Sequence, residues 1–295
     1  MRGLAQRRWL VIGLLVIAVG LTVVALLGPL VSGLIEYRVT ETLRNQTIGL
    51  DAVSLFLVAP LSLFAAVLVR REHIAGSALA LGIGAYTSYM FVQYIVGPDY
   101  AHLPGNNERL FVLCLLLFMA GWLVALVAWN GIEVGSMPNS RGRDRLIGRV
   151  VLPVLALLAF GRYLPVLADV MGSTPEDEGY LAGPNFFWAI AMLDLGVFLP
   201  LTVATCIGLL RGTLWAPKAL YTVVGWFGLV GPAVAAMAIT MYVNDDPNAS
   251  GGSAVFMTGL GLAFAALAVV VFRPLFGING ASGDSGPSRS QARPA

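Results

Sequence analysis

Between Val150 and Met171 the chain reads VVLPVLALLAFGRYLPVLADVM, a run of 22 residues with one arginine and one aspartate among apolar side chains. At a rise of about 1.5 Å per residue, a helix of this length crosses the roughly 30 Å hydrocarbon core of a bilayer. The run therefore predicts a transmembrane helix that carries Arg162 near its middle.

The rest of the chain has the same character. It contains 295 residues, of which 58% are hydrophobic and only 12% charged, which excludes an ordinary soluble domain. We predict an all-α polytopic integral membrane protein, with eight transmembrane helices within residues 1–276 and a disordered cytoplasmic tail at 277–295. The eight apolar runs are Trp9–Leu34, Ile48–Val69, Ile74–Val96, Leu110–Asn130, Val150–Met171, Phe186–Leu210, Ala219–Val243 and Ala254–Phe272.

The distribution of basic residues orients these helices. With the N-terminus in the cytoplasm, fourteen of the 18 Lys and Arg residues fall on the cytoplasmic side, and only Arg38, Arg44 and Arg109 fall outside. Because short cytoplasmic loops are enriched in Lys and Arg, both termini are predicted to be cytoplasmic. One lysine beside abundant Gly, Ala and Arg is typical of a bacterial protein, so we expect the bacterial plasma (inner) membrane.

Several kinds of chemistry are excluded by composition. A net charge of +2 does not suit a nucleic-acid partner, and the chain has no phosphate-binding loop motif for ATP. His73 and His102 fall on opposite sides of the membrane, and Cys114 and Cys206 lie in apolar runs, so neither pair suggests a haem or metal site. We therefore predict no metal, no cofactor and no catalytic residue.

The second and sixth runs share a pattern that suggests an internal repeat. Asp51 is followed by Pro60 after nine residues, and Asp194 by Pro200 after six, and both helices run from outside to inside. A parallel 4+4 duplication would explain this pattern, since an even number of helices preserves direction. Chance recurrence of Leu-Pro-Leu in apolar helices is the alternative. The repeat halves would be 9–130 and 150–272.

Two charges are expected to meet inside the membrane. Arg162 lies 13 residues beyond Arg149, or about 19 Å from the inner surface, and Asp194 lies about 12 Å below Phe186 at the outer surface. Because the hydrocarbon is about 30 Å thick, the two depths agree, and we predict an Arg162–Asp194 ion pair with Asp169 as a second candidate partner. Such charges mark functional sites by default, although the pair would also serve as a structural clamp.

The third helix adds a polar stripe. Tyr86, Tyr89 and Gln93 follow a spacing of three and four residues, which places them on one helical face in the outer half of the membrane. Tyr94 is off this face and is interpreted as part of the interfacial aromatic belt. Asp51 lies about one turn inside the outer end of the second helix, where it would be hydrated. These positions predict an outward-facing polar pocket formed mainly by helices two, three, five and six.

From Gly84 to Phe111 the chain reads GAYTSYMFVQYIVGPDYAHLPGNNERLF. This stretch resembles a family of uncharacterised bacterial and archaeal polytopic membrane proteins, in which a tyrosine-rich helix is followed by Gly-x-x-Tyr and by a Leu-Phe that enters the next helix. The insert before the Leu-Phe is longer here than in the family pattern. The resemblance implies a polytopic membrane fold and brings no established activity. The residues on which the resemblance rests are Tyr86, Tyr89, Tyr94, Gly97, Tyr100, Leu110 and Phe111.

These patterns favour an ATP-independent transporter or binding protein for a small solute or ion, surrounded by membrane lipid. Two alternatives remain open. One is a membrane-embedded enzyme on a lipid-linked substrate, with Asp51 or Asp194 as acid/base. The other is a non-catalytic subunit of a membrane complex, and the sequence is also compatible with a homo-oligomer. The residues expected to bind the solute are Arg162, Asp194, Tyr86, Tyr89, Gln93 and Asp51.

Overall fold

The computed structural model describes residues 2–133, 135–138 and 140–277, and these residues form helices and loops without a strand. The predicted tail lies outside the described residues from 278 onward. The α-helices are α1 (Arg2–Leu27), α2 (Glu41–Val53), α3 (Ala59–Arg70), α4 (Ile74–Val96), α5 (Phe111–Gly131), α6 (Arg141–Leu146), α7 (Leu152–Phe160), α8 (Tyr163–Val170), α9 (Glu178–Ala182), α10 (Pro184–Leu193), α11 (Leu199–Arg211), α12 (Ala216–Val243) and α13 (Gly251–Phe272). Short π or 3₁₀ segments are η1 (Ser54–Val58), η2 (Asn107–Leu110), η3 (Ile147–Val151), η4 (Asp194–Phe198) and η5 (Arg273–Phe276).

Eight helical segments of the described chain are long and apolar enough to cross a membrane, which confirms the predicted number. The third segment has the predicted bounds, Ile74–Val96. The first differs, because α1 begins at Arg2 and ends at Leu27 rather than at Leu34. Gly28 and Pro29 follow it, and the residue before a proline disfavours the helical conformation, so the helix stops while the apolar run continues.

Three spans contain a π-helical turn immediately before a proline. Ala59, Leu152 and Leu199 each precede a proline and donate their N–H to a carbonyl five residues back instead of four. A proline ring displaces the carbonyl four residues before it and supplies no N–H, so the chain accommodates one extra residue in the preceding turn. The π turn of the sixth span is η4, which begins with Asp194.

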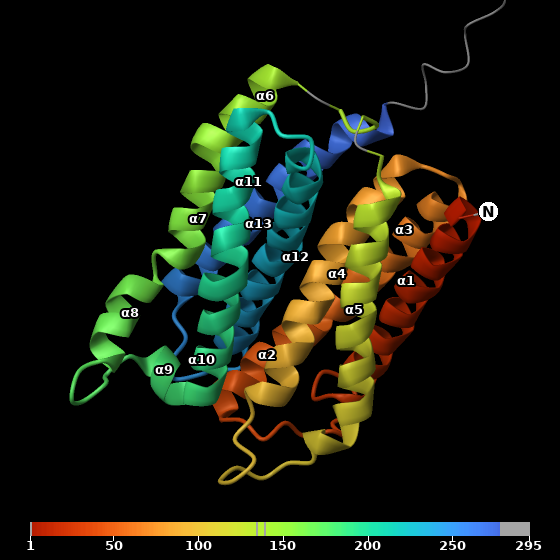
Figure 1. Cartoon of the computed structure of the whole chain (residues 1–295). Coiled ribbons are helices and arrows are strands. Elements are labelled where there is room, and N and C mark those ends of the chain that lie inside the picture. The colour runs from red at the N-terminus through yellow and green to blue at the C-terminus, as the bar shows by residue number, and fades with distance from the viewer. Residues whose placement is uncertain (1, 134, 139, 278–295) are drawn as a thin grey trace, which may run out of the picture.

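The fifth span is interrupted instead of kinked. It runs through α6, η3 and α7, breaks at Gly161 and Arg162, and resumes as α8. Pro165 removes the N–H that would bond to the Gly161 carbonyl, and the Leu164 N–H bonds to that carbonyl instead. Figure 1 shows α8 turning away from the axis of α7 at this break. The break frees the Arg162 side chain from the regular helical surface.

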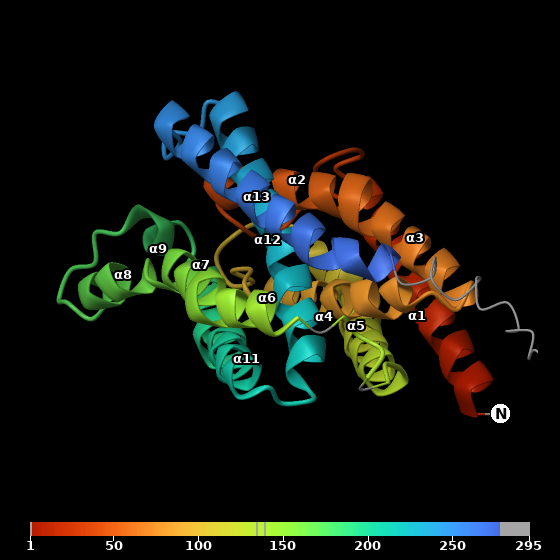
Figure 2. The same ribbon diagram turned by 90° about the horizontal axis from the view of Figure 1, so that it is seen from above.

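The helices form two groups that meet at α4 and α12. Figures 1 and 2 show α1, α3 and α5 beside α4, and α11 and α13 beside α12. α4 and α12 cross where an added Cβ on Gly82 would lie 2.7 Å from the Gly225 Cα. Glycine is needed at this crossing because the two backbones touch there. α2 also packs on α12, with Gly49 against the backbone of Ala236.

Both ends of the described chain lie at the same end of the bundle (Figure 1). Arg7 in α1 pairs with Glu72, and the neighbouring His73 ring lies 5.5 Å from the ring of Phe276 in η5. The loops at 28–40, 97–106 and 171–177 lie at the opposite end.

Candidate functional site

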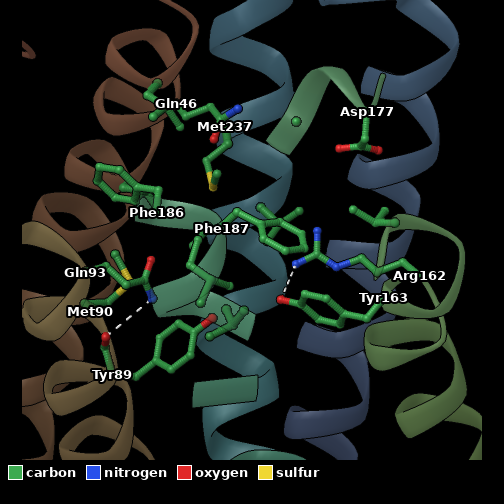
Figure 3. A pocket seen from close by; sticks show the side chains of 18 residues that line it. Gln46, Tyr89, Met90, Gln93, Arg162, Tyr163, Asp177, Phe186, Phe187 and Met237 are labelled. Carbon is green, nitrogen blue, oxygen red and sulfur yellow. Dashed lines mark hydrogen bonds between the residues drawn. The ribbon is translucent and has the colours of Figure 1, made fainter. Parts of the chain in front are cut away.

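A cavity of about 340 Å³ lies at the end of the bundle opposite to the N-terminus. Its walls come from α2, α4, α8, α10 and α12 and from the segment that precedes α10 (Figure 3). Helices two, three, five and six were expected to form a pocket, and all four contribute. α12, from the seventh span, was not expected and supplies a further wall.

Asp194 does not line this cavity but is hydrogen-bonded to two residues that do, Tyr89 and Tyr163. It is the first residue of η4, and its side chain is only 7% exposed. Oδ1 accepts a hydrogen bond from the Tyr89 hydroxyl at 2.9 Å, and Oδ2 accepts one from the Tyr163 hydroxyl at 2.8 Å. Hydrogen bonds to an ionised group are roughly twice as strong as neutral ones, so the two tyrosines hold this carboxylate in place.

The predicted Arg162–Asp194 pair is present. An Arg162 guanidinium nitrogen lies 3.8 Å from Asp194 Oδ2 and donates to the Tyr163 hydroxyl at 3.1 Å. The guanidinium carbon also lies 4.8 Å from the centre of the Tyr163 ring, at the distance of a cation–π contact. The Arg162 side chain is 61% exposed and lines the cavity (Figure 3), so this cation has a counter-charge below it and open space beside it.

Asp169 does not have its predicted role as a partner of Arg162. Its Oδ2 accepts hydrogen bonds from the backbone N–H groups of Glu176 and Asp177, at 3.0 and 2.8 Å. The carboxylate therefore shapes the loop after α8 and is occupied there. Asp177, in turn, accepts from the Tyr180 N–H at the start of α9 and contributes to the cavity rim.

The remaining cavity wall is mixed. Gln93 lines it as expected, and its Nε2 donates weakly to the Tyr89 carbonyl at 3.4 Å. Gln46 of α2 adds a second amide on the same side (Figure 3). Apolar wall residues include Met90, Phe186, Phe187, Ile190 and Met237. The cavity thus has one cationic side chain, two amides, the Asp177 carboxylate at its rim and a largely apolar and aromatic surround, which is the composition of a small-molecule site.

An aromatic layer of Phe198, Trp226 and Tyr89 adjoins the cavity, and of these three residues Tyr89 lines it. The Phe198 ring, at the other end of η4, stacks on Trp226 of α12 with ring centres 3.7 Å apart. The Tyr89 ring meets both, at 5.4 Å from Phe198 and 5.2 Å from Trp226.

Two of the predicted site residues lie elsewhere. Tyr86 is fully buried about one turn from Tyr89 in α4 and does not line the cavity. Asp51 is not hydrated at the pocket mouth: it is 1% exposed and accepts a hydrogen bond from the Tyr94 hydroxyl at 2.8 Å. Tyr94 is therefore a buried partner of Asp51, and its interpretation as an interfacial belt residue was wrong.

Tyr163 was not among the residues that the sequence predicted to bind the solute. It adjoins Arg162 in the chain, yet only the break at Gly161 and Arg162 turns its hydroxyl toward Asp194. A regular helix through this region would have given no reason to link the tyrosine with the sixth span.

Within the described residues, no group of three or more His, Cys, Asp or Glu side chains is arranged to hold a metal ion. Comparison of the chain with protein-family models, with curated proteins and with solved structures finds no match.

Proposed function

We propose that this protein is an ATP-independent membrane transporter that binds a small organic anion in the cavity between α2, α4, α8, α10 and α12. The observation that carries the proposal is the position of Arg162. Its side chain is 61% exposed and lines a cavity of about 340 Å³, and a guanidinium nitrogen lies 3.8 Å from a carboxylate that two tyrosine hydroxyls already bind.

The anion class follows from this arrangement. Asp194 is held by Tyr89 and Tyr163, so it neutralises Arg162 in part without occupying the donors of the guanidinium. A guanidinium offers five N–H donors, and carboxylate, phosphate or sulfonate groups accept two of them at once. The Phe186 and Phe187 rings beside it suit an apolar or aromatic body on the same molecule.

We propose that both termini are cytoplasmic and the cavity faces outward, in the inner membrane of a bacterium. The support is the excess of Lys and Arg at the end of the bundle that contains the N-terminus. A second, smaller cavity of about 160 Å³ near Lys218 lies at that end of α12, beyond the aromatic layer. Cavities at both ends of the bundle suit alternating access better than binding alone.

A 4+4 repeat is part of the proposal. The π turns before Pro60 and Pro200 have the same offset from the proline, which the turn before Pro153 shares, and aligning them places Ser54 instead of Asp51 opposite Asp194. The crossing of α4 and α12 at Gly82 and Gly225 joins the third helix of one half to the third of the other. Alternating access commonly moves one such half against the other.

The proposal is tested with purified protein in lipid nanodiscs and a panel of small anions that includes benzoate, phosphate and benzenesulfonate. A ligand present at about 100 times its Kd raises the unfolding free energy by about 2.7 kcal/mol, so a binder raises the melting temperature. We expect at least one anion to do so in the wild type and in Arg44→Gln, an exposed control arginine of the outer end. Arg162→Gln should abolish the shift.

Two results would contradict the proposal. One is a shift that persists in Arg162→Gln, which would place the anion elsewhere. The other is the absence of any shift in the wild type together with no uptake of labelled benzoate, phosphate or benzenesulfonate into proteoliposomes.

A further inference from the structure

Asp51 forms a second buried polar cluster, separate from the cavity. One carboxylate oxygen, Oδ1, accepts the hydrogen bond from Tyr94. The other, Oδ2, is fully buried and has no hydrogen-bond partner among the described residues. A buried carboxylate oxygen without a partner is costly, and such costs are retained at functional sites.

The end of α1 faces this oxygen. An added Cβ on Gly28 would lie 2.7 Å from Asp51 Oδ2 and 3.5 Å from the Tyr37 hydroxyl oxygen, so only glycine lets the chain approach so closely. The Tyr37 hydroxyl is likewise buried without a partner. The last turn of α1, whose carbonyl oxygens carry partial negative charge, lies near this carboxylate, since the same added Cβ would lie 3.1 Å from the Val24 carbonyl oxygen. The surroundings of Oδ2 therefore favour a cation.

The groups around Asp51 do not supply a cation. The titratable neighbours are Tyr37 from the loop after α1, Tyr86 and Tyr94 from α4, and Cys114 from α5. Burial, and secondly Asp51 itself, raise the pKa of the Tyr37 hydroxyl far above its usual range, so this phenol stays neutral. No Arg, Lys or His in the described part of the chain forms a salt bridge with Asp51.

We propose that Asp51 is a proton-binding site, in which a proton taken from water on the outer side bonds to Oδ2 and converts the carboxylate to the neutral acid. Release of that proton to water restores the carboxylate, so charge and atoms balance without another reactant. A divalent metal ion would need six or more oxygen ligands, whereas Oδ2 has one phenol and one helix end beside it.

The proton site shares its helices with the cavity. Leu50, next to Asp51 in α2, lines the cavity, and so does Gln93, next to Tyr94 in α4. The Tyr94–Asp51 hydrogen bond thus links two walls of the cavity from behind. Resting on the proposed function, we infer that loading of this site with a proton is coupled to anion binding and transport.

Infrared difference spectroscopy of the full chain in nanodiscs tests the proton site without any anion. On a change from acid to alkaline pH we expect the loss of a C=O band of a buried carboxylic acid, with a frequency shift in D₂O. The band should be absent in Asp51→Asn, shifted in frequency in Tyr94→Phe, and unchanged in Glu176→Gln, an exposed carboxyl at the same end.

The proton site is overturned if the band is missing from the wild type or survives in Asp51→Asn. It is also overturned if replacing choline by Na⁺ removes the band, because a sodium ion would then be the ligand. Misfolding of Asp51→Asn does not decide the matter, since the frequency shift in Tyr94→Phe assigns the band independently.

Coupling is tested in proteoliposomes that contain a pH-sensitive dye, with benzenesulfonate as the probe because this anion carries no proton itself at neutral pH. We expect an inward gradient of the probe to acidify the lumen with the wild type. Asp51→Asn should still bind the probe in the melting assay and move no protons. Equal acidification by Asp51→Asn would overturn the coupling, whereas loss of probe binding by the wild type would count against the proposed function and leave the infrared result standing.

Discussion

Arg162 and Asp194 face each other at 3.8 Å, which is longer than a hydrogen bond between them would be. The Tyr163 hydroxyl fills the space, accepting from the guanidinium at 3.1 Å and donating to the carboxylate at 2.8 Å. The neutral hydroxyl therefore connects the two charged groups by hydrogen bonds. The guanidinium can turn toward an anion while Asp194 keeps its hydrogen bonds to Tyr89 and Tyr163.

Removal of the bridge should weaken the fold and the site together. In Tyr163→Phe, Asp194 loses one of its two hydroxyl donors, and hydrogen bonds to charged groups contribute about 1.5–3 kcal/mol. We expect a loss of about 2 kcal/mol in the unfolding free energy, measured by denaturant titration in detergent. Tyr242→Phe, at an exposed tyrosine, is the control and should change it by less than about 0.5 kcal/mol. Equal stability of the two variants would show that the bridge is not energetically important.

A double-mutant cycle separates a site from a clamp. Arg162→Ala leaves the buried Asp194 without its cation, and Asp194→Ala leaves the guanidinium without its anion, so each single variant should be destabilised. The double variant should recover part of this loss, with a coupling energy of about 1–3 kcal/mol from thermal unfolding. Anion binding should be lost in all three variants. Recovery of binding in the double variant would indicate that the pair is a clamp only.

The crossing of α4 and α12 should tolerate no side chain. A Cβ at Gly82 would lie 2.7 Å from the Gly225 Cα, so Gly82→Ala must separate the two helices. Overpacking of this kind costs about 1–3 kcal/mol, which should appear as a lower melting temperature. Gly259→Ala in α13, where nothing lies within 4 Å of the added atom, should leave the melting temperature unchanged. If both variants melt at the wild-type temperature, the helices are not in close contact.

The orientation of the protein in the membrane can be tested by cysteine labelling. The native thiols are buried at Cys114 and half-buried at Cys206, so added cysteines give the main signal. In intact cells, a membrane-impermeant maleimide should label Ser173→Cys in the loop after α8 and spare Ser140→Cys before α6, because the positive-inside rule places the second in the cytoplasm. The reverse pattern would invert the protein in the membrane. Labelling of the wild type sets the background.

The number of spans could be predicted from sequence because it depends on length and hydropathy alone. The Arg162–Asp194 pair could also be predicted, since the bilayer converts residue counts into depths and charges must meet at equal depth. The end of α1 was misplaced, because Gly28 and Pro29 stop a helix without interrupting the apolar run. Converting residue counts into depths in the bilayer thus gave correct predictions where local backbone geometry had no influence.

Contacts that depend on irregular backbone were not predictable in this way. The second span contains a π turn, which shifts the helical faces by one residue. Asp51, just before this turn, accepts a hydrogen bond from Tyr94 instead of facing solvent. Tyr86 and Tyr89 share a helical face by spacing, yet of the two only Tyr89 lines the cavity, where its ring also contacts Trp226 from α12. A sequence periodicity cannot reveal which ring from a distant helix fills that space.

The π turn η4 has Asp194 at its first position and Phe198 at its last. If this turn reverts to regular α-helical hydrogen bonding, one residue leaves the wider turn, and every side chain within it rotates by about 100° relative to the helix that follows. The carboxylate that anchors Arg162 and the ring that stacks on Trp226 would then swing as a unit. The anchoring of Arg162 and the packing on Trp226 would therefore change together and not independently.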